Sequence, residues 1–93
     1  MGKFIIELTD IAKEHLRKQM KTGDKATIKK IEIILYELSI HPYEGTGKPE
    51  LLKYELKGFW SRRINKKDRM IYLVNHNKVI VEVISAMGHY TDK

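Results

Sequence analysis

A carboxylate, Glu50, and a histidine, His89, are the residues whose types and neighbours best fit acid–base chemistry. Glu50 follows a Gly-Lys-Pro sequence and stands among many cations, while His89 follows Gly88 just past the last apolar run and precedes Tyr90. A positioned carboxylate can accept a proton and a positioned histidine can donate one, so the two form a candidate base and acid. The ordinary alternative is that both are solvated surface side chains.

Cations are concentrated around Glu50, in the segment 47–69. This segment holds eight Lys or Arg and three Asp or Glu, a net charge of +5, whereas the whole chain carries +6. Because like charges on neighbouring strands repel, such a concentration indicates an anionic partner such as phosphate. The residues predicted to contact phosphate are Lys48, Arg62, Arg63, Lys66 and Lys67. A solvated strand face without a ligand is the alternative.

These residue types together match the requirements of RNA cleavage. Attack of a ribose 2′-OH on its own 3′-phosphate needs a base, an acid for the leaving 5′-oxygen, and cations on the phosphoryl oxygens. Glu50 could be the base, His89 the acid, and Lys53 with Arg69 the cations, with no metal and no cofactor. Tyr90 is the aromatic residue most suited to stack on a base.

Composition excludes several other classes of protein. Without Cys the chain has no disulfides and no thiolate metal site. The remaining histidines, His15, His41 and His76, lack the spacing of metal ligands and are expected to pack or face solvent. No apolar run approaches the ~20 residues of a membrane span. The expectation is one soluble, basic, intracellular domain spanning residues 1–93, with no membrane partner.

Hydrophobic periodicity predicts the elements that position the N-terminal half. A short apolar run predicts a strand over residues 3–8. Apolar positions at helical spacing then predict two helices, 11–22 and 25–40, which form an antiparallel hairpin. Between them, Gly23 is expected to take the left-handed conformation that ends a helix, and Asp24 to cap the next one.

The second half predicts strands separated by turns at 65–68 and 75–78. The strand ranges are 51–56, where the pattern is weak, 59–64, 69–74 and 79–86. In the second of these, alternation groups Trp60, Arg62 and Ile64 on one face. The order βααβββ(β) predicts an α+β fold, in which a two-helix N-terminal hairpin packs on a twisted, mainly antiparallel sheet of four or five strands.

Three segments and a terminal pair carry a family resemblance. They are Gly47-Lys48-Pro49-Glu50-Leu51-Leu52-Lys53, Gly58-Phe59-Trp60-Ser61-Arg62-Arg63-Ile64, Arg69-Met70-Ile71-Tyr72 and His89-Tyr90. In this order they resemble the YoeB/Txe branch of the RelE-like toxins, which are the toxin halves of type II toxin–antitoxin modules. The chain differs from the best-known members in its last three residues, 91–93, and in the segment 84–88.

The resemblance implies a microbial RNase-like fold and a toxin that cleaves mRNA in the ribosomal A site and so inhibits translation. It implies Glu50 as general base and His89 as general acid. Arg69, assisted by Lys53, would stabilise the phosphoryl charge, and Tyr90 would orient or stack against the substrate. The implied location is the cytoplasm of a prokaryote.

The implied partners are a YefM-like antitoxin, the ribosome with its A-site mRNA, and operator DNA bound through the antitoxin complex. A homodimer is a further candidate assembly. Two other functions stay open at the level of sequence. One is a noncatalytic RNA- or operator-binding module that uses the same cations, and the other is a relative of the same fold that attacks DNA gyrase.

Overall fold

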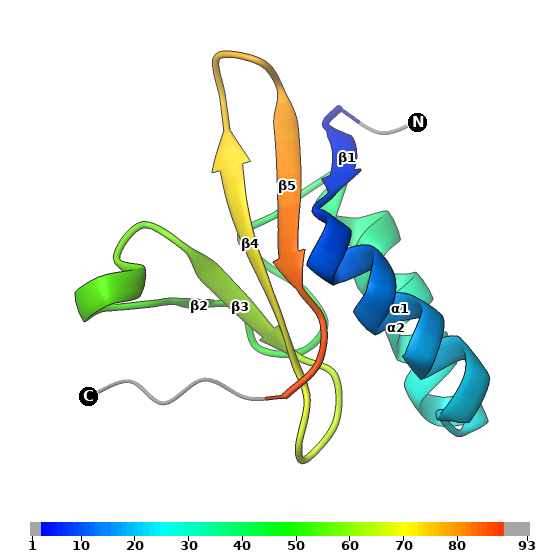
Figure 1. Ribbon diagram of the computed structural model, residues 1–93. Coiled ribbons are helices and arrows are strands. Elements are labelled where there is room, and N and C mark those ends of the chain that lie inside the picture. Colours follow the sequence, from blue (N-terminus) through cyan, green and yellow to red (C-terminus); the bar gives the residue numbers. More distant parts are fainter. Residues whose placement is uncertain (1–2, 89–93) are drawn as a thin grey trace.

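Two helices cover one face of a strongly twisted five-stranded sheet (Figure 1). The computed structural model describes residues 3–88. In chain order the elements are β1 (Ile5–Leu8), α1 (Asp10–Thr22), α2 (Lys25–Leu38), β2 (Glu50–Leu51), a 3-10 turn (Tyr54–Leu56), β3 (Trp60–Arg63), β4 (Arg69–Asn75) and β5 (Ile80–Ser85). The predicted α+β class and the helical hairpin that precedes most of the sheet are confirmed. No helix in the described part of the chain is long and apolar enough to cross a membrane.

The strands lie in the order β1-β5-β4-β3-β2. Three of the four pairings are antiparallel, and only β1 runs parallel to its neighbour β5. The parallel pairing is possible because the helical hairpin and the remaining strands separate β1 from β5 in the sequence, which gives a connection long enough for the crossover. In Figure 1, β2 and β3 turn away from the helices, because the sheet twists along its width.

The core lies between the helices and the sheet face that they cover. Its buried apolar members include Leu16, Ile31, Ile34, Leu38, Met70, Tyr72, Val81 and Val83. The members from the helices recur at helical spacing, and those from the strands alternate along each strand, as the sequence pattern predicted. Burial of this one face leaves the other face of the sheet available for a site.

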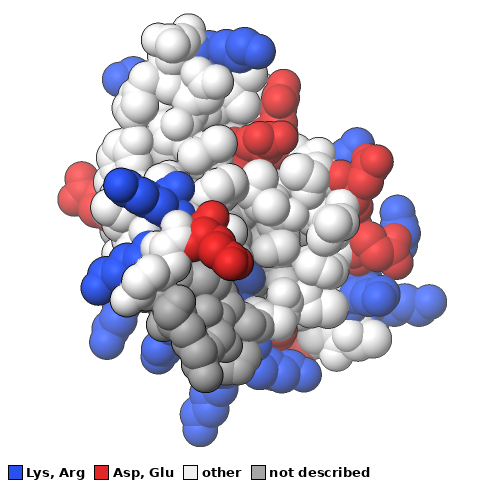
Figure 2. Space-filling model, turned by 60° about the vertical axis from the view of Figure 1, so that its left-hand side comes forward, with Lys and Arg blue, Asp and Glu red and all other residues white. Residues whose placement is uncertain are grey.

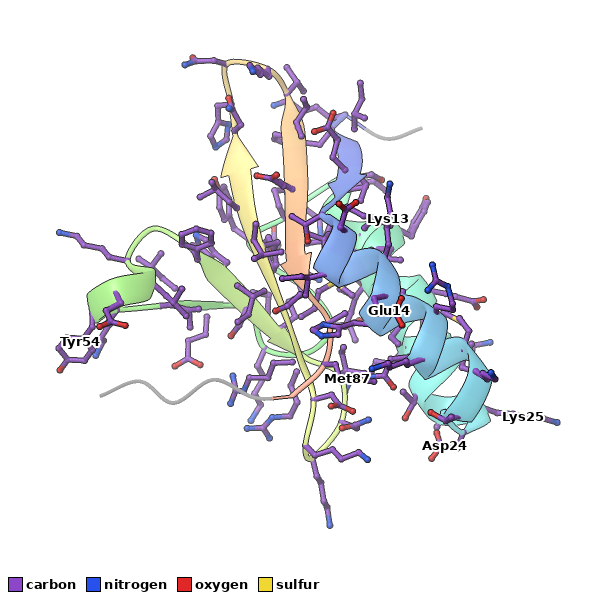
Figure 3. All side chains as sticks on the ribbon, viewed as in Figure 1. Lys13, Glu14, Asp24, Lys25, Tyr54 and Met87 are labelled. Carbon is purple, nitrogen blue, oxygen red and sulfur yellow. The ribbon has the colours of Figure 1, made fainter. Side chains whose placement is uncertain are left out.

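Gly23 contradicts the sequence prediction. Its φ and ψ are −74° and 155°, so it is extended rather than left-handed. The chain passes directly into the cap of α2, where the Asp24 side chain accepts a hydrogen bond of 2.7 Å from the Thr27 N–H. Glycine is needed here for space, since a Cβ would lie 2.5 Å from the Gln19 carbonyl oxygen. This turn is marked by Asp24 in Figure 3.

Arg62 is the largest fully buried side chain among the described residues. Its Nε donates to the Tyr72 hydroxyl at 3.2 Å, and Nη1 donates to Glu37 Oε1 at 2.6 Å. The remaining bonds go to the backbone carbonyls of Thr46, His41 and Glu44 at 3.3, 3.0 and 2.8 Å. These contacts use the five N–H donors of a guanidinium. The prediction that Arg62 contacts phosphate is therefore wrong, because no part of its side chain reaches solvent.

The Arg62 bonds hold together a long loop between α2 and β2, residues 39–49, that has no helix or strand of its own. Glu37 contributes as well, by accepting bonds from the Thr46 N–H at 2.8 Å and hydroxyl at 2.9 Å. Burial raises the pKa of Glu37, but the hydrogen bonds from Thr46 and Arg62 outweigh it and lower the pKa below its ordinary value. The loop is thus ordered by polar contacts to buried groups.

Replacement of Arg62 is expected to destabilise the fold strongly. Arg62→Ala removes the cation paired with the Glu37 carboxylate and the donor to three loop carbonyls, so the free energy of unfolding should fall by about 3–5 kcal/mol. Arg63→Ala is the matched control, because Arg63 is the next residue of β3 and is exposed. That change should cost about 0.5 kcal/mol or less. Urea denaturation followed by circular dichroism measures both, and equal losses would contradict the assigned role of Arg62.

Candidate functional site

Glu50 and Arg69 lie side by side although 19 residues separate them in sequence. Glu50 opens β2 and pairs with Ser61 of β3, while Arg69 opens β4. Arg69 Nη1 lies 3.3 Å from Glu50 Oε1 and 3.3 Å from Ser61 Oγ. The Glu50 side chain is 62% exposed and that of Arg69 is 22% exposed. The site therefore offers an accessible carboxylate beside a guanidinium held partly inside the protein.

The other predicted cations, apart from Arg62, are exposed. Arg63 lies directly across from Arg69 in the β3–β4 pairing. Two like charges in this position repel, which an anion between or beside them would relieve. Lys48 precedes β2, Lys53 follows it, and the turn between β3 and β4 carries two more lysines, Lys66 and Lys67. In the space-filling view, Lys and Arg side chains gather on the left and lower parts of the face, and a group of acidic side chains lies at upper right (Figure 2).

The loop that leads into Glu50 approaches β3 very closely. The Arg63 N–H donates a hydrogen bond of 2.7 Å to the Gly47 carbonyl. Gly47 has φ +87°, and a Cβ there would lie 2.7 Å from the Arg63 carbonyl oxygen. The next residue, Lys48, has a positive φ of 52°, which is uncommon for a residue with a side chain. This backbone path fixes where β2 begins, and so it fixes the position of Glu50, the first residue of β2.

The last described residue, Gly88, is bonded to the same region. Its carbonyl accepts a 2.9 Å hydrogen bond from the Arg69 N–H, and its own N–H donates at 2.9 Å to Asp68 Oδ1. The predicted acid His89 and the predicted stacking residue Tyr90 lie outside the described residues, so their roles stay predictions. Gly88, the residue before His89 in the sequence, is thus hydrogen-bonded to the backbone of Arg69.

Comparison with known proteins identifies the family. A model of the YoeB-like toxin of bacterial type II toxin–antitoxin systems matches residues 12–90 of this chain. The chain belongs to the YoeB-like toxins. A toxin YoeB of Synechocystis sp. is 39% identical to it over 68 residues, which are 73% of this chain and 77% of the relative. The sequence resemblance to the RelE-like toxins is confirmed.

Solved structures of YoeB toxins share this fold over nearly the whole chain. A YoeB/ParE toxin from Agrobacterium tumefaciens has a TM-score of 0.85 at 31% identity, covering 94% of this chain and all of that one. YoeB from Staphylococcus aureus, in a heterotetrameric YoeB–YefM complex, has a TM-score of 0.78 at 34% identity over 96% of this chain and all of that one. A YoeB dimer from S. aureus has a TM-score of 0.81 at 33% identity, with the same coverage.

Two residues of this YoeB-like site were not predicted from the sequence. Ser61 is fully buried and accepts a hydrogen bond from Arg69. The strand alternation placed Ser61 on the opposite face from Trp60 and Arg62, but nothing in the sequence indicated that this serine would bind Arg69. Asp68 was assigned only to a hairpin turn, although its carboxylate binds Gly88, 20 residues away.

The described histidines have structural partners. His15 Nδ1 accepts a hydrogen bond from the Ala86 N–H at 3.1 Å, and His76 Nε2 lies 2.7 Å from the Tyr43 hydroxyl. His41 Nδ1 lies 3.0 Å from the Glu44 carbonyl oxygen. Within residues 3–88, no three His, Asp or Glu side chains come together as metal ligands would.

The close approach of Gly47 to β3 predicts a specific cost for adding a side chain. Gly58 provides a matched control, since its φ is +96° but a Cβ there meets nothing within 4 Å. Gly58→Ala should cost only the conformational penalty, about 1–2 kcal/mol. Gly47→Ala should cost about 1–3 kcal/mol more, because the added methyl overlaps the backbone of Arg63. Thermal unfolding of both variants tests this difference, and equal costs would contradict it.

Proposed function

We propose that this YoeB-like toxin is an endoribonuclease that cleaves mRNA in the ribosomal A site without a metal ion and thereby inhibits translation. The observation that supports this most directly is the exposed Glu50 carboxylate held 3.3 Å from the Arg69 guanidinium, among exposed cations. Binding of phosphate alone requires the cations but gains nothing from a carboxylate among them. A carboxylate in that position suits proton transfer next to a bound phosphate.

The proposed reaction is an internal phosphoryl transfer. Glu50 accepts the proton of a ribose 2′-OH, and the 2′-oxygen then forms a bond to the neighbouring phosphorus. The bond from phosphorus to the 5′-oxygen breaks as His89 donates a proton to that oxygen, which leaves a 2′,3′-cyclic phosphate and a 5′-hydroxyl. Arg69 and Lys53 stabilise the charge on the phosphoryl oxygens. Tyr90 orients the substrate by stacking on a base.

We also propose that a YefM-like antitoxin neutralises the toxin and that the complex binds operator DNA through the antitoxin. The YoeB–YefM complex of S. aureus supports the first part. The S. aureus YoeB dimer supports a homodimer as a further assembly of this chain. The exposed cations Lys48, Arg63, Lys66 and Lys67 are proposed to contact ribosomal or messenger RNA phosphates.

Conservative replacement of the base or the acid is expected to abolish cleavage. Glu50→Gln and His89→Gln each remove one proton-transfer group, so the cleavage rate on mRNA-programmed ribosomes should fall at least about 100-fold. Ribosome binding should be largely unchanged, because neither change removes a Lys or Arg that is proposed to contact phosphate. Primer extension on mRNA in a translating extract measures the cuts and their position in the codon.

A nearby carboxylate provides the control for this experiment. Glu55 is exposed in the same basic segment, and Glu55→Gln should leave cleavage unchanged. Full activity of both the Glu50 and His89 variants would reject the catalytic mechanism and favour a noncatalytic RNA-binding module. Growth inhibition without mRNA cuts but with inhibited DNA supercoiling would instead favour the gyrase alternative.

The proposed phosphate contacts predict a change in salt dependence. Arg63→Met or Lys66→Met should weaken binding to a short single-stranded RNA, and each should reduce the slope of log affinity against log salt by about 0.7. Lys25→Met is the control, because Lys25 is exposed at the start of α2, in the turn between the two helices (Figure 3). Fluorescence anisotropy at several salt concentrations gives these slopes. Equal slopes for all three variants would argue against phosphate contacts at Arg63 and Lys66.

A further inference from the structure

The segment that follows β5 is held by side chains from two other parts of the fold. Gln19 Nε2 of α1 donates a 3.0 Å hydrogen bond to the Ala86 carbonyl, and the Ala86 N–H donates to His15 Nδ1. Two residues later, the Gly88 N–H donates to Asp68 Oδ1. Regular strand pairing has ended at this point, so side chains take over the role of a neighbouring strand.

The bond from Gln19 to Ala86 is buried and the bonds to His15 and Asp68 are partly buried, so they constrain the position of this segment. Ala86 is fully buried, and Gln19 and Asp68 are each 4% exposed. Burial raises the pKa of Asp68, but hydrogen bonds from the Gly88 N–H and from the Gln19 and Asn65 side chains outweigh it and lower the pKa below its ordinary value. Gln19 thus holds the Ala86 carbonyl, and Asp68 holds the Gly88 N–H.

Side chains of α1 hold the segment that follows β5, although the two are far apart in the sequence. Figure 3 shows Met87 where the chain runs between α1 and the β3–β4 turn. Gln19, Asp68, Met87 and Gly88 all line one cavity of about 430 Å³ at this junction. Met87 and Gly88 thus lie against a gap on one side, while Ala86 is packed in the core, and the polar contacts add to that packing in defining the path of the segment.

We propose that Gln19 and Asp68 are positioning residues for the cleavage reaction. They hold Ala86 and Gly88, and so set the point beside Arg69 from which the chain continues to His89 and Tyr90. This inference rests on the proposed function, because the residue whose position matters, His89, is the general acid of the proposed reaction. An acid must lie within hydrogen-bond reach of the leaving oxygen, and a misplacement of about 1 Å can cost about 100-fold in rate.

His15 is a third member of this set with a defined chemical state. Because its Nδ1 accepts the Ala86 N–H, that nitrogen carries no proton and the ring proton is on Nε2. His15 and Gln19 lie one turn apart on α1, and both bond to Ala86. Neither side chain has a hydrogen bond to Glu50 or Arg69 in the described structure.

A purely stabilising role makes a different experimental prediction from a positioning role. Loss of stability lowers the amount of folded toxin and leaves the rate of each bound toxin unchanged. Loss of positioning lowers the single-turnover cleavage rate while affinity for the ribosome stays the same. The matched control is Leu16→Ala, which removes buried packing from the same helix but leaves the contacts to Ala86 and Gly88 intact.

The test compares Gln19→Met, Asp68→Ala and Asp68→Asn with Leu16→Ala and the unaltered protein on mRNA-programmed ribosomes. Gln19→Met and Asp68→Ala should slow single-turnover cleavage about 10- to 100-fold at unchanged ribosome affinity. Asp68→Asn keeps an oxygen for the Gly88 N–H and should recover part of the rate. Amide exchange measured without ribosomes should be about tenfold faster at Gly88 in Asp68→Ala, since the hydrogen bond that protects this amide is lost.

The outcomes separate the inference from the proposed function. If the unaltered protein cleaves and the Gln19 and Asp68 variants cleave equally fast despite faster exchange, the positioning role is overturned and the ribonuclease function stands. If Leu16→Ala slows cleavage as much as Gln19→Met does, the role is structural only and the inference is likewise overturned. If the unaltered protein makes no cuts, the proposed function fails and the positioning role fails with it.

Discussion

The buried guanidinium of Arg62 is the interaction on which the site side of this fold depends. A charge removed from water is costly unless it is paired and fully hydrogen-bonded. Here the pairing to Glu37 and the bonds to Tyr72 and three carbonyls meet that requirement. The loop before Glu50 is folded around a charge rather than around an apolar cluster.

The site is therefore held from two directions by polar anchors. Arg62 fixes the loop that delivers Glu50, and the α1 side chains with Asp68 fix the segment that follows β5. Strand β4 connects the two, because Tyr72 contacts Arg62 while Arg69 contacts both Glu50 and Gly88. The apolar core under the helices gives this strand its rigidity, so the geometry of the site depends on packing at some distance from it.

Much of the fold could be predicted from the sequence, because helical and strand periodicity are local properties. The helices, the two hairpin turns and the long strands agree with the structure to within about two residues. The prediction of a left-handed Gly23 was wrong, because glycine is required there to leave room for the Gln19 carbonyl and not for its backbone conformation. The prediction that Arg62 contacts phosphate was wrong, because its charge was given more weight than the strand alternation. That alternation grouped Arg62 with Trp60 and Ile64. The contacts of Ser61 and Asp68 depend on strand register and on distant segments, which no local pattern encodes.

The parallel pairing of β1 with β5 has a consequence for the order of folding. Ile5 lies opposite Ile80, so β1 has no place in the sheet until β5 has been synthesised. Contacts of such long sequence separation form slowly, and the core residues Val81 and Val83 also arrive late. The sheet of this YoeB-like toxin therefore cannot be completed before β5 has been synthesised and has left the ribosomal exit tunnel.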